Sequence, residues 1–217
     1  HKTGDLRDII DRLLELTGLE TGYHAMHPQP IDLSAVVAAV AAAADLPTGV
    51  LLHTDVPAGL LVNADPHRLR QIIDALLGNA VKYNLNGEDI HLAGHGRDAG
   101  VVELTVTDAG LGIPAPEREQ LFSRFYRADN ARHSAVKGVG LGLTLVRVLV
   151  EAHGGTVTVD PDHRPGTRIV VRLPACTAWS ASRTGATAPP QHRSTALPGG
   201  APGAVDPLDR GARAGVF

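Results

Sequence analysis

The sequence predicts an α/β domain in which amphipathic helices and short strands follow one another along the chain. Three patterns carry this prediction. A long apolar stripe at helical spacing follows Asp65-Pro66, two segments over 88–94 and 101–107 have the alternation and the connecting turn of an antiparallel hairpin, and a second helical stripe follows Gly142.

Two helices are predicted in the first 50 residues. Apolar residues recur at helical spacing over 5–17 with charged residues on the opposite face, so this helix needs a partner surface. The second helix spans about 34–45 and begins behind Asp32 or Ser34 as its N-cap.

A third helix begins after Asp65, which is placed to cap it, with Pro66 at the first helical position. Its apolar stripe is expected to face the core. The stripe comprises Leu69, Ile72, Ile73, Leu76, Leu77 and Ala80.

The remaining elements follow from shorter patterns. Strands are predicted at 50–54, 60–63, 88–94, 101–107, 155–160 and 168–173. The stretch 108–137 is predicted to be mostly loop, with one short helix near 117–125. The last helix is expected to pack one face against the core, with Leu141, Leu145, Val148, Leu149 and Ala152.

Composition limits the function classes. The chain has 217 residues, with 20 Lys+Arg against 23 Asp+Glu and a formal net charge of −3. A duplex-binding protein needs a clustered basic face, so this balance excludes electrostatic nucleic-acid binding as the main activity. The single cysteine, Cys176, excludes a disulfide framework and a multi-thiolate zinc site. No apolar run approaches the roughly 18 residues of a membrane span.

The two ends of the chain carry expectations of their own. The chain starts at His1 rather than at a methionine, and no signal peptide follows, so we expect it to be the C-terminal part of a longer protein. Residues 175–217 are mostly Gly, Pro, Ala, Ser and Thr without apolar periodicity, which predicts a disordered tail.

A polar residue lies at the edge of the third helix's stripe. Seven residues advance an α-helix by almost two turns, which sets Asn79 about 20° from Ile72. Asn79 is either an amide satisfied at the core edge or an oxygen donor to a divalent cation. In the second case Lys82, one turn further on, would meet phosphate, and Tyr83 would form a wall beside it.

Glycines follow Asp108, which ends an alternating strand. Gly110 and Gly112 would let the backbone approach a planar ligand closely, and the carboxylate can accept a hydrogen bond from an exocyclic amine. The alternative is an ordinary Asp-Gly turn.

A second glycine run leads into the last helix. Gly138, Gly140 and Gly142 precede a helix N-terminus, where free N–H groups and the helix dipole favour a phosphate. The same order of strand, loop, glycines and helix also fits a tight turn.

Taken together, these segments resemble the catalytic, ATP-binding domain of sensor histidine kinases, a branch of the GHKL ATPase superfamily with the Bergerat fold. In the order of that family's N, G1, F, G2 and G3 boxes they are Asn79–Tyr83, Asp108–Gly112, the Phe122/Phe125/Tyr126 cluster, Gly138–Leu143 and Gly166-Thr167. The resemblance covers about 30–174. Residues 1–22 resemble the end of the dimerisation and histidine-phosphotransfer helix that precedes this domain.

The resemblance implies both a fold and an activity. The fold would be a two-layer sandwich, with a mixed, mainly antiparallel sheet of about five strands and three helices on one face. The activity would be that of an ATP-dependent protein histidine kinase of a two-component signal transduction system. It would use Mg²⁺-ATP to phosphorylate a histidine on its own or a partner chain's dimerisation domain, for relay to a response regulator. The parent protein would be a homodimer, and this chain the cytoplasmic part of a membrane-anchored sensor.

The resemblance also implies roles for individual residues. Asn79 would bind Mg²⁺ and, with Lys82, serve catalysis, and Asp108 would accept a hydrogen bond from the adenine amino group. The other nucleotide contacts would come from Lys82 with Gly138, Gly140, Leu141 and Gly142 at the phosphates, and from Tyr83, Gly110, Gly112, Ile113 and Thr167 around the base. Residues 127–137 would form a lid, with Arg127, Arg132 or Lys137 reaching the γ-phosphate.

Two departures from the family pattern keep other activities open. Ala75 stands where relatives often carry a second Asn or an acidic residue, and Asp74 lies about 140° around the helix from Asn79 and cannot replace it. No histidine has the context of a phosphoacceptor. His53 falls on a predicted strand and His153 at a helix end, so the acceptor is expected on another segment or chain. The alternatives are an anti-sigma-factor serine kinase and a degenerate module that binds a nucleotide or a partner without phosphotransfer.

Overall fold

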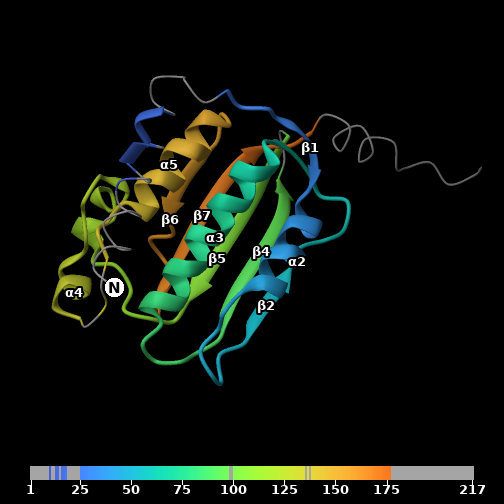
Figure 1. Cartoon of the computed structure of the whole chain (residues 1–217). Helices are drawn as coiled ribbons and strands as arrows, with labels where there is room; N and C mark the ends of the chain where they lie inside the picture. Colours follow the sequence, from blue (N-terminus) through green and yellow to red (C-terminus); the bar gives the residue numbers. More distant parts are fainter. Residues whose placement is uncertain are drawn as a thin grey trace, which may run out of the picture. The chain divides into compact units, whose positions relative to one another are not determined.

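The structure, a computed structural model, describes residues 10, 13–14, 16–18, 25–97, 100–134, 136 and 138–176. Five strands form one sheet in the order β2-β4-β5-β7-β6 (Figure 1). Their bounds are β2 Leu52–Asp55, β4 Ile90–Arg97, β5 Val101–Asp108, β6 Thr156–Val159 and β7 Thr167–Pro174. The pair β2 and β4 is parallel and the other pairs are antiparallel, so the implied mixed, mainly antiparallel sheet is confirmed.

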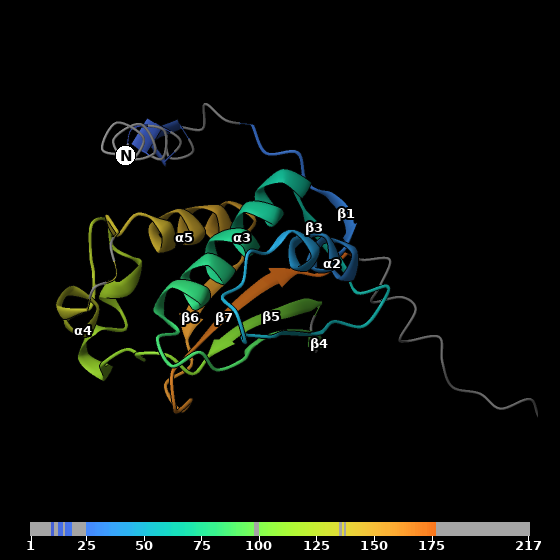
Figure 2. The ribbon, with the colours of Figure 1, turned by 60° about the horizontal axis from the view of Figure 1, so that its bottom comes forward.

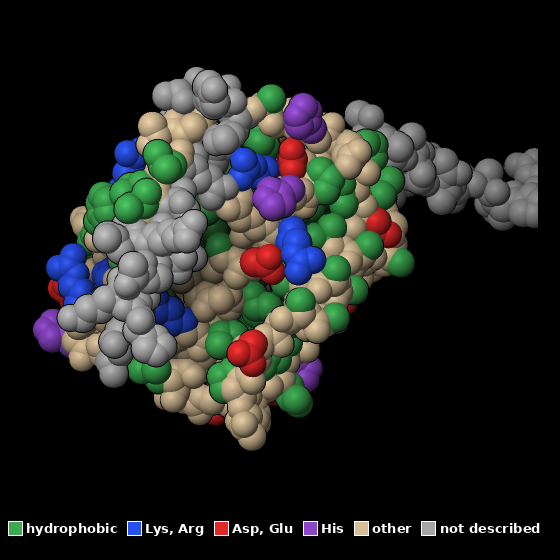
Figure 3. All heavy atoms as spheres, viewed as in Figure 1, with side chains coloured by type: hydrophobic (Ala, Val, Ile, Leu, Met, Phe, Trp, Pro, Cys, Tyr) green, Lys and Arg blue, Asp and Glu red, His purple; other side chains and the backbone are tan. Residues whose placement is uncertain are grey.

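Three helices cover one face of this sheet, which confirms the two-layer sandwich. They are α2 (Leu33–Ala43), α3 (Pro66–Tyr83) and α5 (Gly142–Ala152). Figure 2 shows them on the same side of the strands, with α3 between α2 and α5. On the face seen in Figure 3, basic and acidic side chains are interspersed.

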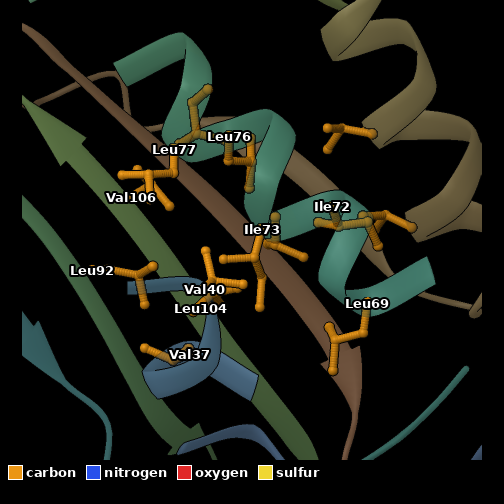
Figure 4. Close-up of a cluster of buried hydrophobic side chains, with 14 of the residues drawn as sticks. Val37, Val40, Leu69, Ile72, Ile73, Leu76, Leu77, Leu92, Leu104 and Val106 are labelled. Atoms are coloured by element: carbon orange, nitrogen blue, oxygen red, sulfur yellow. The ribbon is translucent and has the colours of Figure 1, made fainter. Parts of the chain in front are cut away.

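The central helix forms as its sequence predicts. Asp65 is the N-cap, and its carboxylate accepts hydrogen bonds from the N–H groups of His67 and Arg68 at 3.0 and 3.1 Å. The six apolar residues predicted for the stripe are the six that are buried. Figure 4 shows five of them, Leu69, Ile72, Ile73, Leu76 and Leu77, between the sheet and the neighbouring helices. Since burying a large aliphatic side chain contributes about 1.5–3 kcal/mol, this stripe is a main source of the domain's stability.

The structure decides between Asp32 and Ser34 as the N-cap of the first helix after residue 25. Asp32 is the N-cap of α2, because its side chain accepts a hydrogen bond from the N–H of Ser34 at 2.9 Å. The preceding β1 (Gln29–Asp32) pairs with β3 (Leu61–Ala64) in a separate two-stranded antiparallel sheet. The strand predicted at 60–63 therefore exists, but it does not join the main sheet.

The segment between β5 and α5 differs from its prediction. The prediction of a helix near 117–125 is wrong. This stretch forms two 3₁₀ turns instead, η1 (Ala115–Glu117) and η2 (Gln120–Phe122). Pro116 cannot donate to a helical ladder, and Phe125 has a φ of 61°, which is outside the right-handed helical region. The expected loop at 127–137 contains one short helix, α4 (Asp129–His133).

One expectation about α5 changes. Ala152 of α5 is exposed, whereas Val146 and Val150 are buried between α5 and its neighbours, because α5 packs against both α3 and the sheet. Beyond β7, the N–H of Ala175 donates to the carbonyl oxygen of Gly100 at 2.7 Å, and the buried Cys176 donates its N–H to the carbonyl oxygen of Leu61 at 3.0 Å.

The predicted helix over 5–17 falls largely outside the described residues. Those that are described there, Ile10, Leu13, Leu14 and Leu16–Thr17, have helical backbone, and Leu16 is buried in the core cluster. The predicted tail lies outside the described residues from 177 onward. Within the described part of the chain, none of the helices is both long and apolar enough to cross a bilayer.

Candidate functional site

A cavity of about 420 Å³ opens at the C-terminal end of α3. Figure 2 shows that this end of α3 lies toward α4. Its walls come from α3, the end of β5 and the loop after it, α4, the entry to α5, and β7. Of the twelve residues that the resemblance assigns to the site, all but Gly110 line this cavity. Segments from four distant parts of the sequence therefore meet as that assignment requires.

The wall formed by α3 carries two polar side chains. Asn79 is half-buried, and its side-chain nitrogen is buried without a hydrogen-bond partner among the described residues. The ammonium of Lys82 lies 5.2 Å from the centre of the Tyr83 ring. Asp74 is exposed and does not line the cavity, as its position on the helix predicts. Its Oδ2 lies 3.4 Å from the Nε of Arg70.

Asp108 is a buried carboxylate at the end of β5. Its Oδ1 accepts a hydrogen bond from the N–H of Gly110 at 2.9 Å, and the backbone of Thr167 donates a second one. Burial raises the pKa of Asp108 to about 6, although both hydrogen bonds act in the opposite direction. A carboxylate offers about four acceptor positions, so Asp108 retains the capacity to accept a hydrogen bond from a ligand.

The loop after β5 packs tightly against its neighbours through glycines. A Cβ at Gly110 would overlap the carbonyl oxygen of Tyr83, and a Cβ at Gly166 would overlap that of Asp108. Gly112 has a φ of 64°, and a Cβ at this position would lie 3.1 Å from the carbonyl oxygen of Gly166. Gly110 therefore fixes the loop against α3 from outside the cavity, rather than lining it.

The second glycine run meets two other segments. A Cβ at Gly138 would overlap the Lys82 ammonium, and a Cβ at Gly140 would lie 2.5 Å from the carbonyl oxygen of Tyr126. No side chain caps the start of α5 behind Leu141. Among the described residues, no side chain accepts from the first-turn N–H groups at the point where Leu141 and Gly142 line the cavity.

The three candidate cations of the 127–137 segment have different positions. Arg127 lines the cavity, and its guanidinium donates to the carbonyl oxygen of Ala131 at 2.8 Å. Arg132 is exposed, with its guanidinium 5.8 Å from the Tyr126 ring centre, and it does not line the cavity. Lys137 lies outside the described residues.

Several lining residues were not predicted from the sequence. Most are apolar, and strand alternation could have indicated two of them. Val106 is two positions before Asp108 on β5, and Ile169 is two positions after Thr167 on the paired strand β7, so each lies on the same face of the sheet as the predicted residue. Asn130 on α4 also lines the cavity, and no local pattern singled it out. Among the described residues, no group of three or more His, Cys, Asp or Glu side chains could hold a metal ion.

Neither histidine considered as an acceptor lies at the cavity. His53 is exposed on β2, with its Nε2 2.8 Å from an Asp89 carboxylate oxygen. His153 is the C-cap residue of α5, as predicted, and it is buried beside the start of α3.

Comparison with known proteins identifies this arrangement. Residues 64–177 match the family of histidine kinase-, DNA gyrase B- and HSP90-like ATPases. The chain is 32% identical over 173 residues to the sensor-like histidine kinase SenX3 of Mycolicibacterium smegmatis, covering 78% of this chain and 44% of the relative. It is 34% identical over 179 residues to the histidine protein kinase DivJ of Caulobacter vibrioides, covering 81% of this chain and 30% of the relative. The chain thus spans less than half the length of these relatives.

Solved structures agree. The mycobacterial sensor histidine kinase MprB has a TM-score of 0.58 and 30% identity, over 69% of this chain and 98% of that chain. Full-length ShkA in complex with AMPPNP has a TM-score of 0.67 and 27% identity, over 81% of this chain and 37% of that chain. This chain therefore belongs to the family of histidine kinase-, DNA gyrase B- and HSP90-like ATPases, and its fold is the Bergerat ATP-binding fold of sensor histidine kinases.

Proposed function

We propose that the chain is the catalytic part of a protein histidine kinase of a two-component system. It binds ATP in the cavity and transfers the γ-phosphoryl group to a histidine on a dimerisation domain, either its own or that of a partner chain. A response regulator then receives the phosphoryl group. In this proposal the parent protein is a homodimer anchored in the membrane, and this chain lies on the cytoplasmic side.

The observation that carries the proposal is the content of the cavity. It combines a buried carboxylate, Asp108, with a lysine, Lys82, and with the uncapped N-terminus of α5. The carboxylate suits an exocyclic amine, whereas a cation and free N–H groups suit phosphates. A molecule with an amino-bearing base and a phosphate chain uses both.

Each group then has a task in the transfer. Asp108 accepts the adenine amino hydrogen, and Tyr83 and Ile113 hold the base. Lys82 and the loop ending in Gly142 bind the phosphates. A neutral imidazole attacks with its own lone pair and ADP leaves with the electrons of the broken P–O bond, so positioning and charge neutralisation replace a general base.

The cavity also fits a Mg²⁺ ion bound together with the phosphates. Asn79 lines the cavity, and its amide oxygen is the atom assigned to the cation. The amide nitrogen, which cannot bind a cation, is buried without a hydrogen-bond partner among the described residues. Ala75 offers no second ligand one turn earlier, which leaves phosphate oxygens and water to complete the shell. When bound, the ion neutralises phosphate charge. Of the two candidate lid cations that the structure describes, Arg127 is the one assigned to the γ-phosphate, because it lines the cavity and Arg132 does not.

Labelled ATP tests this function. The chain is incubated with γ-labelled Mg²⁺-ATP, alone and with the separately produced dimerisation domain of its parent protein. We expect no acid-labile label on the chain alone and slow labelling of the added domain, since the tether that raises local concentration is missing.

The stability of the label separates the alternatives. Acid-labile, alkali-stable label on the added domain supports a histidine kinase, and acid-stable label on serine supports the anti-sigma branch. ATP binding without label on any acceptor would leave a module that binds nucleotide only. Asn79→Ala should lose transfer, whereas Asn86→Ala, outside the cavity, should retain it.

A further inference from the structure

One side chain ties α4 to the loop after β5. The Nδ2 of Asn130 donates to the carbonyl oxygens of Leu111 at 3.1 Å and Gly112 at 2.9 Å. All three residues line the cavity. These hydrogen bonds therefore join two walls of the cavity that are 18 residues apart in the sequence.

The loop that accepts these hydrogen bonds is held firmly from behind. The N–H of Leu111 donates to the carbonyl oxygen of Tyr83 at the end of α3, at 3.2 Å. A Cβ on Gly112 would lie 3.1 Å from the carbonyl oxygen of Gly166, so the β6–β7 loop supports this position closely. If the two walls separate, α4 is the one that moves.

By contrast, α4 is held mainly by polar contacts. It has five residues, and its buried residue is Ala131. A second attachment is Glu117, whose Oε2 accepts hydrogen bonds from the Tyr126 hydroxyl at 2.7 Å and from the N–H of Asp129 at 2.9 Å. Hydrogen bonds exchange with water at small net cost, so α4 can leave the cavity more readily than an element with a buried apolar face.

We infer that Asn130 is a positioning residue that holds α4 over the nucleotide cavity and thereby sets the rate of nucleotide dissociation. The inference rests on the proposed function, because it requires that nucleotide occupies the cavity. Both N–H groups of the Asn130 amide have protein carbonyl acceptors, so the residue acts on the nucleotide through α4.

The test is stopped-flow binding of an ATP carrying a fluorophore on its ribose, measured with the full chain and Mg²⁺. Asn130→Ala should raise the dissociation rate constant about tenfold, as expected from the loss of two hydrogen bonds of ordinary net strength, and leave the association rate constant within about twofold. Asn130→Asp keeps the side-chain shape but places a carboxylate against two carbonyl oxygens. It should raise the dissociation rate constant at least as much.

Asn86→Ala is the matched control. The Asn86 amide also donates to a carbonyl oxygen of the same loop, that of Ala109 at 3.2 Å, but Asn86 lies neither on α4 nor at the cavity. Its dissociation rate constant should stay at the wild-type value. In nucleotide-bound Asn130→Ala, hydrogen exchange should speed up at the amides of 129–134 and not at those of 110–113, with an unchanged melting temperature.

Three results would overturn the inference. Unchanged dissociation from Asn130→Ala would show that these hydrogen bonds do not hold the nucleotide, although the proposed function would stand. An equal increase in Asn86→Ala would assign the effect to the loop rather than to α4. Absence of nucleotide binding by the wild-type chain would remove the proposed function together with the inference.

Discussion

Asp108 should make the domain less stable at neutral pH than at mildly acidic pH. Burial raises its pKa from 3.8 to about 6, so the folded chain binds this proton more tightly than the unfolded chain. The stabilisation from this proton is fully present below pH 3.8 and is lost as the pH rises through about 6. At about 1.4 kcal/mol per pKa unit, complete ionisation lowers the free energy of unfolding by on the order of 3 kcal/mol.

Urea unfolding of the wild type and Asp108→Ala at several pH values measures this contribution. Other carboxylates titrate in both proteins, so the difference between the two free energies of unfolding isolates Asp108. Between pH 4.5 and 7.5, the wild type should lose roughly 2 kcal/mol relative to the variant, since part of the titration lies below pH 4.5.

Glu103, on the same strand, is a control of opposite sign. Burial alone would raise the pKa of Glu103, but hydrogen bonds and charge attraction from Arg97 and Arg172 outweigh it, and the pKa is lowered. The side chain is 7% exposed, with the Arg172 Nη2 at 2.9 Å. Compared with Glu103→Ala, the wild type should therefore lose stability as the pH falls below about 4.5.

ATP binding should respond to pH in the opposite direction to the Asp108 contribution to stability. If the ionised carboxylate accepts the adenine amino hydrogen, affinity should weaken as the pH falls below about 6 in the wild type and change much less in Asp108→Ala.

The stability measurements can refute the assignment of a raised pKa to Asp108. If the difference in free energy of unfolding between the wild type and Asp108→Ala does not depend on pH, folding does not perturb this carboxyl group.

Three further substitutions test other parts of the site and its support. Asn79→Ala should abolish Mg²⁺-dependent ATP binding by calorimetry with an unchanged circular dichroism spectrum, and full affinity would remove the metal assignment. Gly140→Val should reduce ATP affinity at least about tenfold, because a side chain there meets the Tyr126 carbonyl oxygen and the φ of 79° disfavours a branched residue; normal binding would refute this. His153→Ala should lower the free energy of unfolding by about 1–3 kcal/mol in urea, since its Nε2 accepts the Asp65 N–H at 3.0 Å and a buried donor would lose its partner. A change of under about 0.5 kcal/mol would mean that water replaces the imidazole.

Sequence periodicity sufficed where a structure depends on neighbours along the chain. The buried face of α3, its cap at Asp65 and the β4–β5 hairpin follow from spacing and local hydrogen bonding, which do not require knowledge of the partners. The resemblance supplied the assignments of Asn79 and Asp108, and the cavity contains both residues.

Tertiary structure decided the features that depend on which segments meet. Glycine spacing did not reveal that Gly110 packs behind the cavity, against the Tyr83 carbonyl oxygen, rather than in it. The raised pKa of Asp108 depends on its burial in the folded domain, and Asn130 contributes only because α4 packs against the loop that lies 18 residues earlier in the sequence. Burial and long-range hydrogen bonds arise when distant segments pack together, so a pattern read along one chain contains no direct record of them.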